Sequence, residues 1–163
     1  MKKKAIIGIA YFNDSKIKGT VYFSENLEKN IVEIDINLSG LTSNSIHGFH
    51  IHEAGDLQDG CMSACAHFNP YNKNHGGIDS KDRHLGDLGN ISANKNGIVN
   101  YKFSDKMIKL RGIKCNIIGR SLVIHEDEDD CGKTNHPLSL TTGNSGKRIA
   151  CAVIGYSKLM FEK

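Results

Sequence analysis

The sequence predicts an all-β domain whose long loops carry the chemistry. Three observations lead to this prediction. Short segments alternate apolar and polar residues with a period of two, turn residues separate these segments, and two stretches are too long and irregular to be strands or simple turns. At 163 residues and 17.9 kDa, the chain 1–163 is expected to form one domain that buries roughly two thirds of its unfolded surface.

The first strands follow directly from the pattern. An apolar stretch over 5–12 predicts a buried strand, and Asn13-Asp14 predicts a turn after it. Alternation over 17–24 predicts the next strand. The clean alternation over 31–38, with Val32, Ile34, Ile36 and Leu38 on one face, predicts a strand with one buried side.

The second half of the chain predicts four more strands. Asn94-Lys95-Asn96-Gly97 is typical of a hairpin turn, which would join a strand over 88–91 to one over 98–101. Apolar runs over 117–124 and 149–154 predict two buried strands.

Two stretches, about Glu53–Arg83 and about Glu126–Lys147, match no strand pattern. Loops of this length in a compact domain are usually functional or disordered. The first contains Gly76-Gly77 and several potential ligands, so we expect a metal ion to organise it.

Charge and hydropathy exclude two classes of partner. The net charge is only +3, and the lysines are scattered without interleaved aromatic residues, so no nucleic-acid partner is expected. No apolar run is long enough to cross a bilayer, so no membrane partner is expected. The opening 1–12 imitates a signal peptide, but its apolar part is short and 13–16 lacks a small-x-small cleavage pattern. We therefore expect a cytoplasmic or otherwise intracellular protein.

The five cysteines form no CxxC motif, so a thiolate zinc site is not expected. An odd number leaves at least one cysteine without a partner in the chain. Reduced, buried cysteines would be ordinary for a cytosolic protein.

Three histidines suit a copper ion. His50 and His52 are two residues apart, so in a strand both imidazoles project from one face. His125 ends the buried run over 117–124. Such a pair also arises by chance, but three imidazoles at strand ends make a plausible copper site.

The loop after His52 supplies a second set of ligands, spaced His-x7-His-x8-His-x2-Asp. Three imidazoles and one carboxylate complete a tetrahedral zinc site with no open position, which is typical of a structural zinc. The alternative is a set of solvated loop residues. The concentration of ligands beside Gly76-Gly77 argues against it; the four residues are His67, His75, His84 and Asp87.

Six motifs together resemble the copper-zinc superoxide dismutases over nearly the whole chain. They are Gly48-Phe49-His50-Ile51-His52-Glu53, Ala66-His67-Phe68-Asn69-Pro70, His75-Gly76-Gly77, the run 83–90, the run 119–126 and the run 142–151. The resemblance implies an eight-stranded Greek-key β-sandwich or barrel, an architecture for which this family is itself an example. It also implies two long functional loops, a zinc and disulfide loop and an electrostatic loop.

The resemblance implies which residues hold the metals. Copper is held by His50, His52, His67 and His125. Zinc is held by His67, His75, His84 and Asp87. The shared His67 is then an imidazolate that bridges the two ions and passes a proton to the peroxide product. Superoxide is converted to dioxygen and hydrogen peroxide as copper is alternately reduced and reoxidised.

Other residues acquire roles by the same resemblance. Asp129 would orient one copper histidine and one zinc histidine by hydrogen bonds, whereas the acidic run 126–130 alone would favour a solvated charge. Arg148 would attract and position superoxide; without the resemblance a surface arginine is equally expected. His47 would brace the structure without touching metal. His136 matches nothing and is expected to be exposed.

The last loop departs from the family pattern. Lys133 is present, but 134–142 lacks an acidic pair and a further lysine, and has His136-Pro137 and Thr141 instead. Electrostatic steering of superoxide is therefore in doubt, and we expect the salt dependence of the rate to come mainly from Arg148 and Lys133.

Cys61 and Cys151 match the family disulfide, and Cys115 matches an unpaired cysteine near the dimer contact. Cys65 and Cys131 match no family cysteine. The resemblance implies a homodimer and a copper chaperone as a transient partner. The tail over 156–163 is longer than the family pattern and could extend or disturb the dimer interface.

Two other functions compete with the enzyme. A non-catalytic relative that stores or delivers metal would be expected to lose a copper ligand or Arg148, and this chain keeps them all. A zinc-stabilised interaction domain would hold zinc alone. Metal analysis combined with superoxide consumption distinguishes the three.

Overall fold

The computed structural model describes residues 4–162, which contain eight strands. They are β1 (Ile7–Asn13), β2 (Lys18–Asn26), β3 (Ile31–Ser39), β4 (Ile46–His52), β5 (Asp87–Ser92), β6 (Val99–Asp105), β7 (Ser121–His125) and β8 (Arg148–Tyr156). Residues 1–3 of the signal-like opening and Lys163 of the tail lie outside the described residues.

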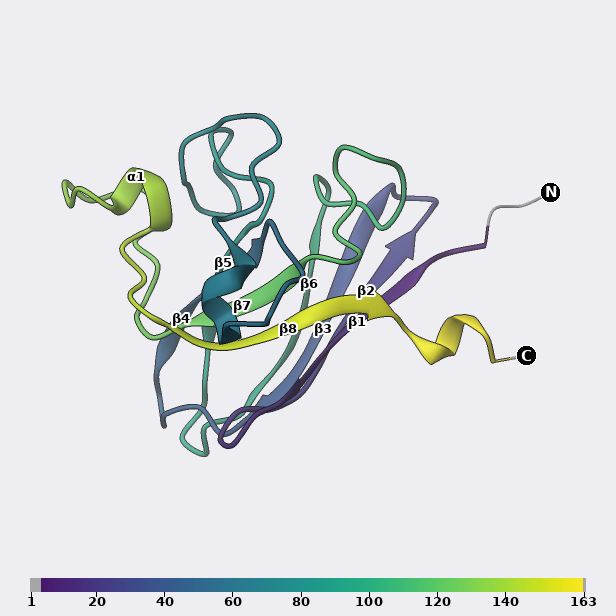
Figure 1. Cartoon of the computed structure of the whole chain (residues 1–163), viewed down its shortest axis with the longest axis horizontal. Helices are drawn as coiled ribbons and strands as arrows, with labels where there is room; N and C mark the ends of the chain where they lie inside the picture. Colours follow the sequence, from purple (N-terminus) through teal and green to yellow (C-terminus); the bar gives the residue numbers. More distant parts are fainter. Residues whose placement is uncertain (1–3, 163) are drawn as a thin grey trace.

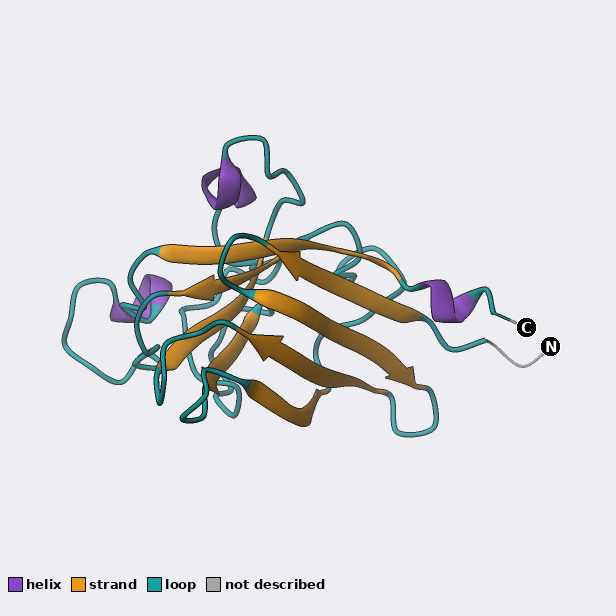
Figure 2. Cartoon of the chain, turned by 90° about the horizontal axis from the view of Figure 1, so that it is seen from below, coloured by secondary structure: helices purple, strands orange, loops and turns teal. Residues whose placement is uncertain are grey.

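All paired strands are antiparallel, in the order β5-β4-β7-β8-β1-β2-β3-β6, and they curve into a nearly closed barrel (Figures 1 and 2). The pairings β3–β6, β4–β7 and β1–β8 join strands that are far apart in sequence, which is the Greek-key pattern. Three short helical segments lie outside the barrel: η1 (Gly60–Ala64), α1 (Ser139–Thr142) and η2 (Lys158–Met160). The predicted all-β barrel is confirmed.

The alternating patterns predict the core correctly. On β3 the residues Val32, Ile34, Ile36 and Leu38 are buried, while Glu33, Asn37 and Ser39 are exposed. The turn before β2 is also as expected, because the Asp14 carboxylate accepts hydrogen bonds from the N–H groups of Lys16 (2.7 Å) and Ile17 (2.6 Å).

The predicted hairpin over 88–101 is only half right. The turn forms, with the Gly97 N–H donating to the Asn94 carbonyl at 2.9 Å and Gly97 at φ 70°. The flanking strands do not pair, however, since β5 pairs with β4 and β6 pairs with β3, at the two ends of the sheet order. The turn therefore crosses from one side of the barrel to the other.

The strand predicted over 117–124 begins later, at Ser121. Ile117 is buried but belongs to a loop, because the Asn116 side chain accepts the Ile118 N–H at 3.0 Å and Gly119 turns the chain at φ 87°. The apolar run thus spans a buried loop residue and a strand. As a result the chain has a third long loop, over 106–120, that the sequence pattern did not reveal.

The two predicted loops are present as 53–86 (the first loop) and 126–147 (the last loop). The disulfide between Cys61 and Cys151 is confirmed, with a Cα–Cα distance of 5.7 Å, and it ties η1 of the first loop to β8. Cys65, Cys115 and Cys131 are free thiols.

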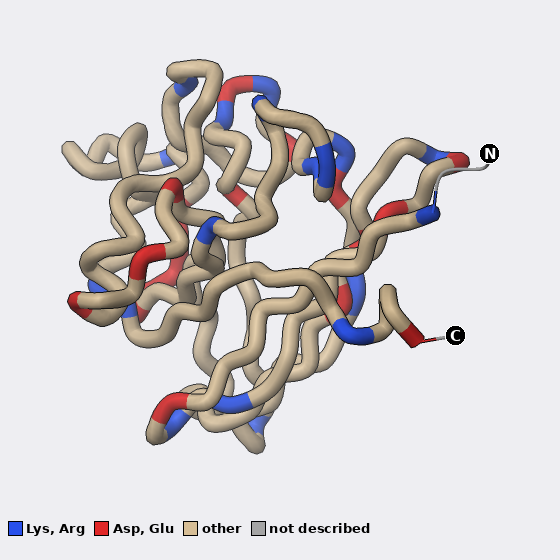
Figure 3. The backbone as a smooth tube through the Cα atoms, turned by 45° about the vertical axis from the view of Figure 1, so that its right-hand side comes forward, with Lys and Arg blue, Asp and Glu red and all other residues tan. Residues whose placement is uncertain are grey.

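Acidic and basic residues are interspersed along the strands and loops (Figure 3). Within residues 4–162, no helix has the length and hydrophobicity needed to span a bilayer.

Candidate metal centre

Paired strands β4 and β7 bring the first histidines together. His52 pairs with Ser121 and His50 with Val123, so His125 at the end of β7 lies beside β4. The register shifts on β4 between Gly48 and His50, and on β7 between Ile124 and His125. Such bulges redirect side chains. His67 of the first loop joins them, because it forms an isolated antiparallel bridge with His52.

The ligand atoms of one group all lie within 4.8 Å of one another, and all four side chains are buried: His50, His52, His67 and His125. Nε2 of His52 lies 3.3 Å from Nε2 of His125. Nδ1 of His50 and Nε2 of His67 are buried with no hydrogen-bond partner among the described residues. Buried polar atoms are nearly always satisfied, so nitrogens left facing one another indicate an ion between them.

In three of these histidines, the ring nitrogen that points away from the group has an oxygen partner. Nε2 of His50 lies 2.7 Å from the Asp129 carboxylate, Nδ1 of His52 lies 2.8 Å from the Cys65 carbonyl, and Nδ1 of His125 lies 3.3 Å from the Gly146 carbonyl. An oxygen acceptor fixes the proton on that nitrogen and leaves the opposite nitrogen with a lone pair for a metal.

The second group surrounds one carboxylate oxygen, Oδ1 of Asp87. Its distances are 2.9 Å to Nδ1 of His67, 3.1 Å to Nδ1 of His75 and 3.2 Å to Nδ1 of His84. Nδ1 of His67 and Nδ1 of His84 are 3.4 Å apart. Ligands 2.0–2.2 Å from a tetrahedral zinc ion are separated by roughly 3.3 to 3.6 Å. The His67–His84 distance falls in this range and the three distances to Oδ1 are slightly shorter, so the four donor atoms converge as a closed zinc site requires and need only small outward shifts to hold the ion.

His67 belongs to both groups. Its Nδ1 faces Asp87 and His84, while its Nε2 faces the histidines on β4 and β7. Its ring centroid lies 4.1 Å from that of His50 and 5.4 Å from that of His84. His50, His67, His75 and Asp87 also lie within 4.8 Å of one another, so the two sites adjoin.

Burial keeps three of the copper-side imidazoles neutral: His52, His67 and His125. Burial, followed by the proximity of His50, lowers the pKa of both His67 and His125 to about 3. Burial and the nearby His67 also hold the pKa of His52 far below its ordinary value. Neutral imidazole is the form that binds a metal, so these rings are ready to act as ligands at physiological pH.

The zinc-side groups behave differently. Burial alone would lower the pKa of His75, but its contacts with Asp129 and Asp87 raise that pKa to about 9. Burial would raise the pKa of Asp87, but hydrogen bonds with His67, His75 and His84 hold it well below its usual range. The Asp87 carboxylate therefore carries a negative charge that a divalent cation can neutralise.

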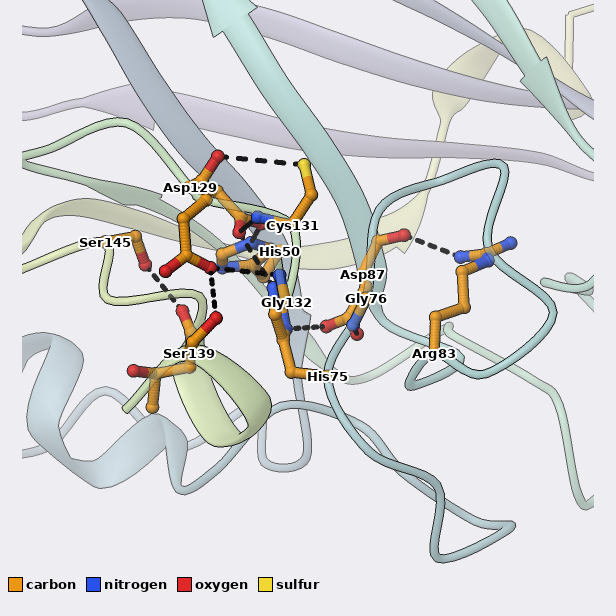
Figure 4. A network of polar contacts seen from close by, with 12 residues as sticks. His50, His75, Gly76, Arg83, Asp87, Asp129, Cys131, Gly132, Ser139 and Ser145 are labelled. Atoms are coloured by element: carbon orange, nitrogen blue, oxygen red, sulfur yellow. Dashed lines mark hydrogen bonds and ion pairs between the residues drawn. The ribbon is translucent and has the colours of Figure 1, made fainter. Parts of the chain in front are cut away.

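Asp129 links the two sites (Figure 4). Its two carboxylate oxygens lie 2.7 Å from Nε2 of His50 and 2.8 Å from Nε2 of His75. The Cys131 N–H and the Asn90 side chain hold Asp129 in place. Gly143 packs so closely that a Cβ on it would lie 1.9 Å from Oδ1 of Asp129, and its φ is 68°. Only glycine fits at this position.

Arg83 holds the backbone of Asp87 in place (Figure 4). The side chain is 2% exposed, its Nη1 donates to the Asp87 carbonyl at 2.6 Å, and its Nη2 forms an ion pair with Asp105 at the end of β6. Asp105 in turn accepts the N–H groups of Met107 and Ile108. The backbone of Asp87, a candidate zinc ligand, is thus anchored to β6.

Arg148 lies at the mouth of the copper side. Its guanidinium donates to the carbonyls of Cys61 (2.7 Å), Met62 (3.3 Å) and Cys65 (2.6 Å). It lines one pocket together with His52, His67 and His125. The Cys65 carbonyl therefore accepts hydrogen bonds from both Arg148 and His52.

Lys133 lines a different hollow, together with Gly77, Lys81 and Cys131. The lysines that line the pocket with Arg148 are Lys73 and Lys147. A role for Lys133 in steering stays a prediction. His136 is exposed, as expected.

Comparison with known proteins decides the family. Residues 17–154 match the model of the copper/zinc superoxide dismutase family. The chain belongs to the copper/zinc superoxide dismutase family. It is 62% identical over 148 residues to a superoxide dismutase [Cu-Zn] of Paramecium bursaria Chlorella virus 1, covering 91% of this chain and 78% of that protein. It is 49% identical over 150 residues to the extracellular superoxide dismutase [Cu-Zn] of Drosophila melanogaster, covering 92% and 82%.

A solved structure shares this fold. The crystal structure of the clock protein EA4 superposes with a TM-score of 0.90 at 39% sequence identity, covering 96% of this chain and 98% of that one. The family's reaction is the dismutation of superoxide, and its cofactors are copper and zinc. The donor groups fit both metals. Family members include both intracellular and extracellular enzymes.

Within this superoxide dismutase fold, the structure brings together every residue that the sequence assigned to the metals. His47 braces the centre as expected: its Nδ1 lies 2.7 Å from the His125 carbonyl and its Nε2 lies 2.6 Å from the Ser45 hydroxyl. Sequence reasoning missed the supporting roles of Arg83, Gly143 and the Cys65 carbonyl. A buried arginine and a surface arginine look alike in a sequence, and a carbonyl acceptor leaves no side-chain signature.

Proposed function

We propose that this chain dismutes superoxide at a copper ion held by His50, His52, His67 and His125, beside a structural zinc ion held by His67, His75, His84 and Asp87. The observation that carries the proposal is the position of His67. Its Nδ1 faces the zinc donors, and its buried Nε2 has no hydrogen-bond partner within residues 4–162. One ring is thereby placed to serve both ions.

When bound, copper supplies the one-electron chemistry that converts superoxide alternately to dioxygen and hydrogen peroxide. The chain's own residues control protons and access. His67 accepts and releases a proton at Nε2 while the zinc side holds Nδ1, so the ring keeps its orientation. Arg148 is a permanent cation at the pocket mouth and attracts the anionic substrate. Asp129 keeps His50 and His75 in their ligand orientations.

The variant His67→Ala tests the shared ring, with His136→Ala as the matched exposed control. We expect His67→Ala to lose about 100-fold or more in superoxide consumption and to change the copper EPR spectrum, because copper loses one imidazole ligand. Metal analysis of the parent separates the alternatives: copper without turnover indicates a carrier, and zinc alone indicates a scaffold. A His67→Ala protein that holds both ions and keeps the parent's rate would refute the proposal.

We propose that the 163-residue chain acts as one domain and assembles as a homodimer. Supporting apolar residues lie on the outer face of β8, where Ile149 is 37% exposed and Val153 is 40% exposed. The tail beyond β8 also exposes Leu159 (43%) and Phe161 (72%). Sedimentation should give twice the chain mass, and Val153→Lys should give the single-chain mass.

We also propose an intracellular, cytoplasmic enzyme that a copper chaperone loads as a transient partner. The three free thiols favour a reducing compartment. Cell fractionation tests the location, since recovery only from the medium would contradict it. Copper content in cells with and without a chaperone tests the partner, because equal loading would contradict the dependence.

A further inference from the structure

The pocket above the copper-side histidines has an apolar rim. Met62 on the first loop is 68% exposed, and Leu138 and Leu140 on the last loop are 49% and 52% exposed. All three line the same pocket as His125 and Arg148. Exposed apolar side chains gathered around a pocket mark a binding surface more often than chance exposure does.

The rim is held in place by the site itself. The Met62 carbonyl accepts from Nη1 of Arg148 at 3.3 Å, and the Leu140 carbonyl accepts from the His75 N–H at 2.9 Å. The Leu138 carbonyl accepts from the Thr142 N–H at 2.8 Å. These apolar side chains therefore project from backbone that is fixed relative to the metal centre, which reduces the entropy cost of binding a ligand there.

The pocket lining carries three basic and two acidic side chains, a net charge of +1 with the histidines neutral. Arg148, Lys73 and Lys147 line the pocket, and the acidic Glu126 and Asp127 lie on the same lining. The guanidinium has five N–H donors, and the contacts to three carbonyls leave some of them for a ligand. A permanent cation beside apolar side chains is complementary to an anion that carries an alkyl chain.

We propose that this pocket binds amphiphilic organic monoanions, with the carboxylate on Arg148 and the alkyl chain along Met62, Leu138 and Leu140. The inference rests on the proposed function in one respect, since such a ligand lies in the path of superoxide and competes with it. A fully buried methylene strengthens binding up to about four-fold, and a methylene on an open rim about two-fold. Affinity therefore rises with chain length until the chain outgrows the rim.

Calorimetry with acetate, butanoate, hexanoate and octanoate tests the binding directly on the metal-loaded protein, without reference to turnover. We expect the dissociation constant to fall about two-fold per methylene, and inhibition of superoxide consumption to follow the same order. In the double variant Leu138→Ser/Leu140→Ser we expect acetate to bind as before while the gain per methylene disappears. Leu27→Ser, which replaces a leucine 44% exposed outside the pocket, should keep the parental series.

Two comparisons make the proposal refutable. Equal binding of hexanol and hexanoate would show that the rim takes neutral apolar groups and would overturn the role of Arg148. Equal binding of acetate and octanoate would overturn the role of the rim. Calorimetry that shows the chain-length series in a protein without superoxide turnover would support the pocket and count against the proposed function, so the two failures are distinguishable.

Discussion

Asp129 offers the sharpest test of how the two metal sites are coupled. Its carboxylate accepts from Nε2 of His50 at 2.7 Å and from Nε2 of His75 at 2.8 Å. The substitution Asp129→Asn keeps the shape of the side chain but replaces one oxygen with an NH₂ group. One of the two imidazole N–H groups must then face a donor instead of an acceptor.

The expected magnitude follows from these contacts. A hydrogen bond to a charged group contributes about 1.5 to 3 kcal/mol, and leaving a buried donor unsatisfied adds a desolvation cost. Loss of such an orienting partner weakens metal binding about 10- to 100-fold. The amide oxygen of asparagine can accept from only one of the two imidazoles, so we expect one metal to bind more weakly by a factor in this range and the other by less.

Competition with a chelator, followed by metal analysis, measures the change for each ion. Glu128→Gln is the matched control, because it removes one exposed charge from the same acidic run and should leave both affinities unchanged. If Asp129→Asn holds both zinc and copper within about three-fold of the parent, Asp129 does not orient the two sites in the way that the contacts indicate.

Three further predictions concern stability. Cys65 adopts φ 65° and ψ −152°, a region that favours glycine, so Cys65→Gly should raise the free energy of unfolding by about 1 to 3 kcal/mol; an unchanged denaturant midpoint would contradict the strain. The disulfide closes a separation of 90 residues, so replacing Cys61 and Cys151 by serine should lower that free energy by about 4 to 5 kcal/mol in the chain-entropy model, and a loss below about 1 kcal/mol would contradict it. Burial would raise the pKa of Glu25, but its ion pair with Arg111 lowers it, so Arg111→Gln should destabilise the protein near neutral pH and progressively less as the pH falls below the ordinary pKa of 4.5. A destabilisation that is constant across this pH range, measured by thermal unfolding, would exclude the ion pair as its cause.

Local patterns predicted the strands and the metal ligands because each depends on short sequence separations. The alternation on β3 depends on the two-residue pleat, and the pairing of His50 with His52 on one face depends on the same period. The candidate zinc ligands lie in the first loop and at the first residue of β5, so their spacing alone indicated a site. Family resemblance then supplied Asp129, Arg148 and the partner of Cys61, which no local pattern specifies.

The errors arose where a distant contact overrides a local preference. The Asn94–Gly97 turn predicts a hairpin, but β5 finds its partner in β4 and β6 finds its partner in β3. Hairpin turns specify a change of direction, and they specify pairing only when no other strand competes for the same edge. The apolar run from Ile117 failed for a similar reason, since a loop residue can fill the core as well as a strand residue can.

Cys65 contributes to the site through its backbone, which its side chain does not reveal in the sequence. It is a free thiol that matches no family cysteine, and its contacts with His52 and Arg148 come from its carbonyl. Its carbonyl lies 2.8 Å from Nδ1 of His52 and 2.6 Å from Nη2 of Arg148. One peptide group thus orients both His52 and Arg148, the residue that we propose attracts the substrate. The strained backbone of Cys65 is consistent with selection for the position of that carbonyl, because a thiol in this conformation costs stability that glycine would not.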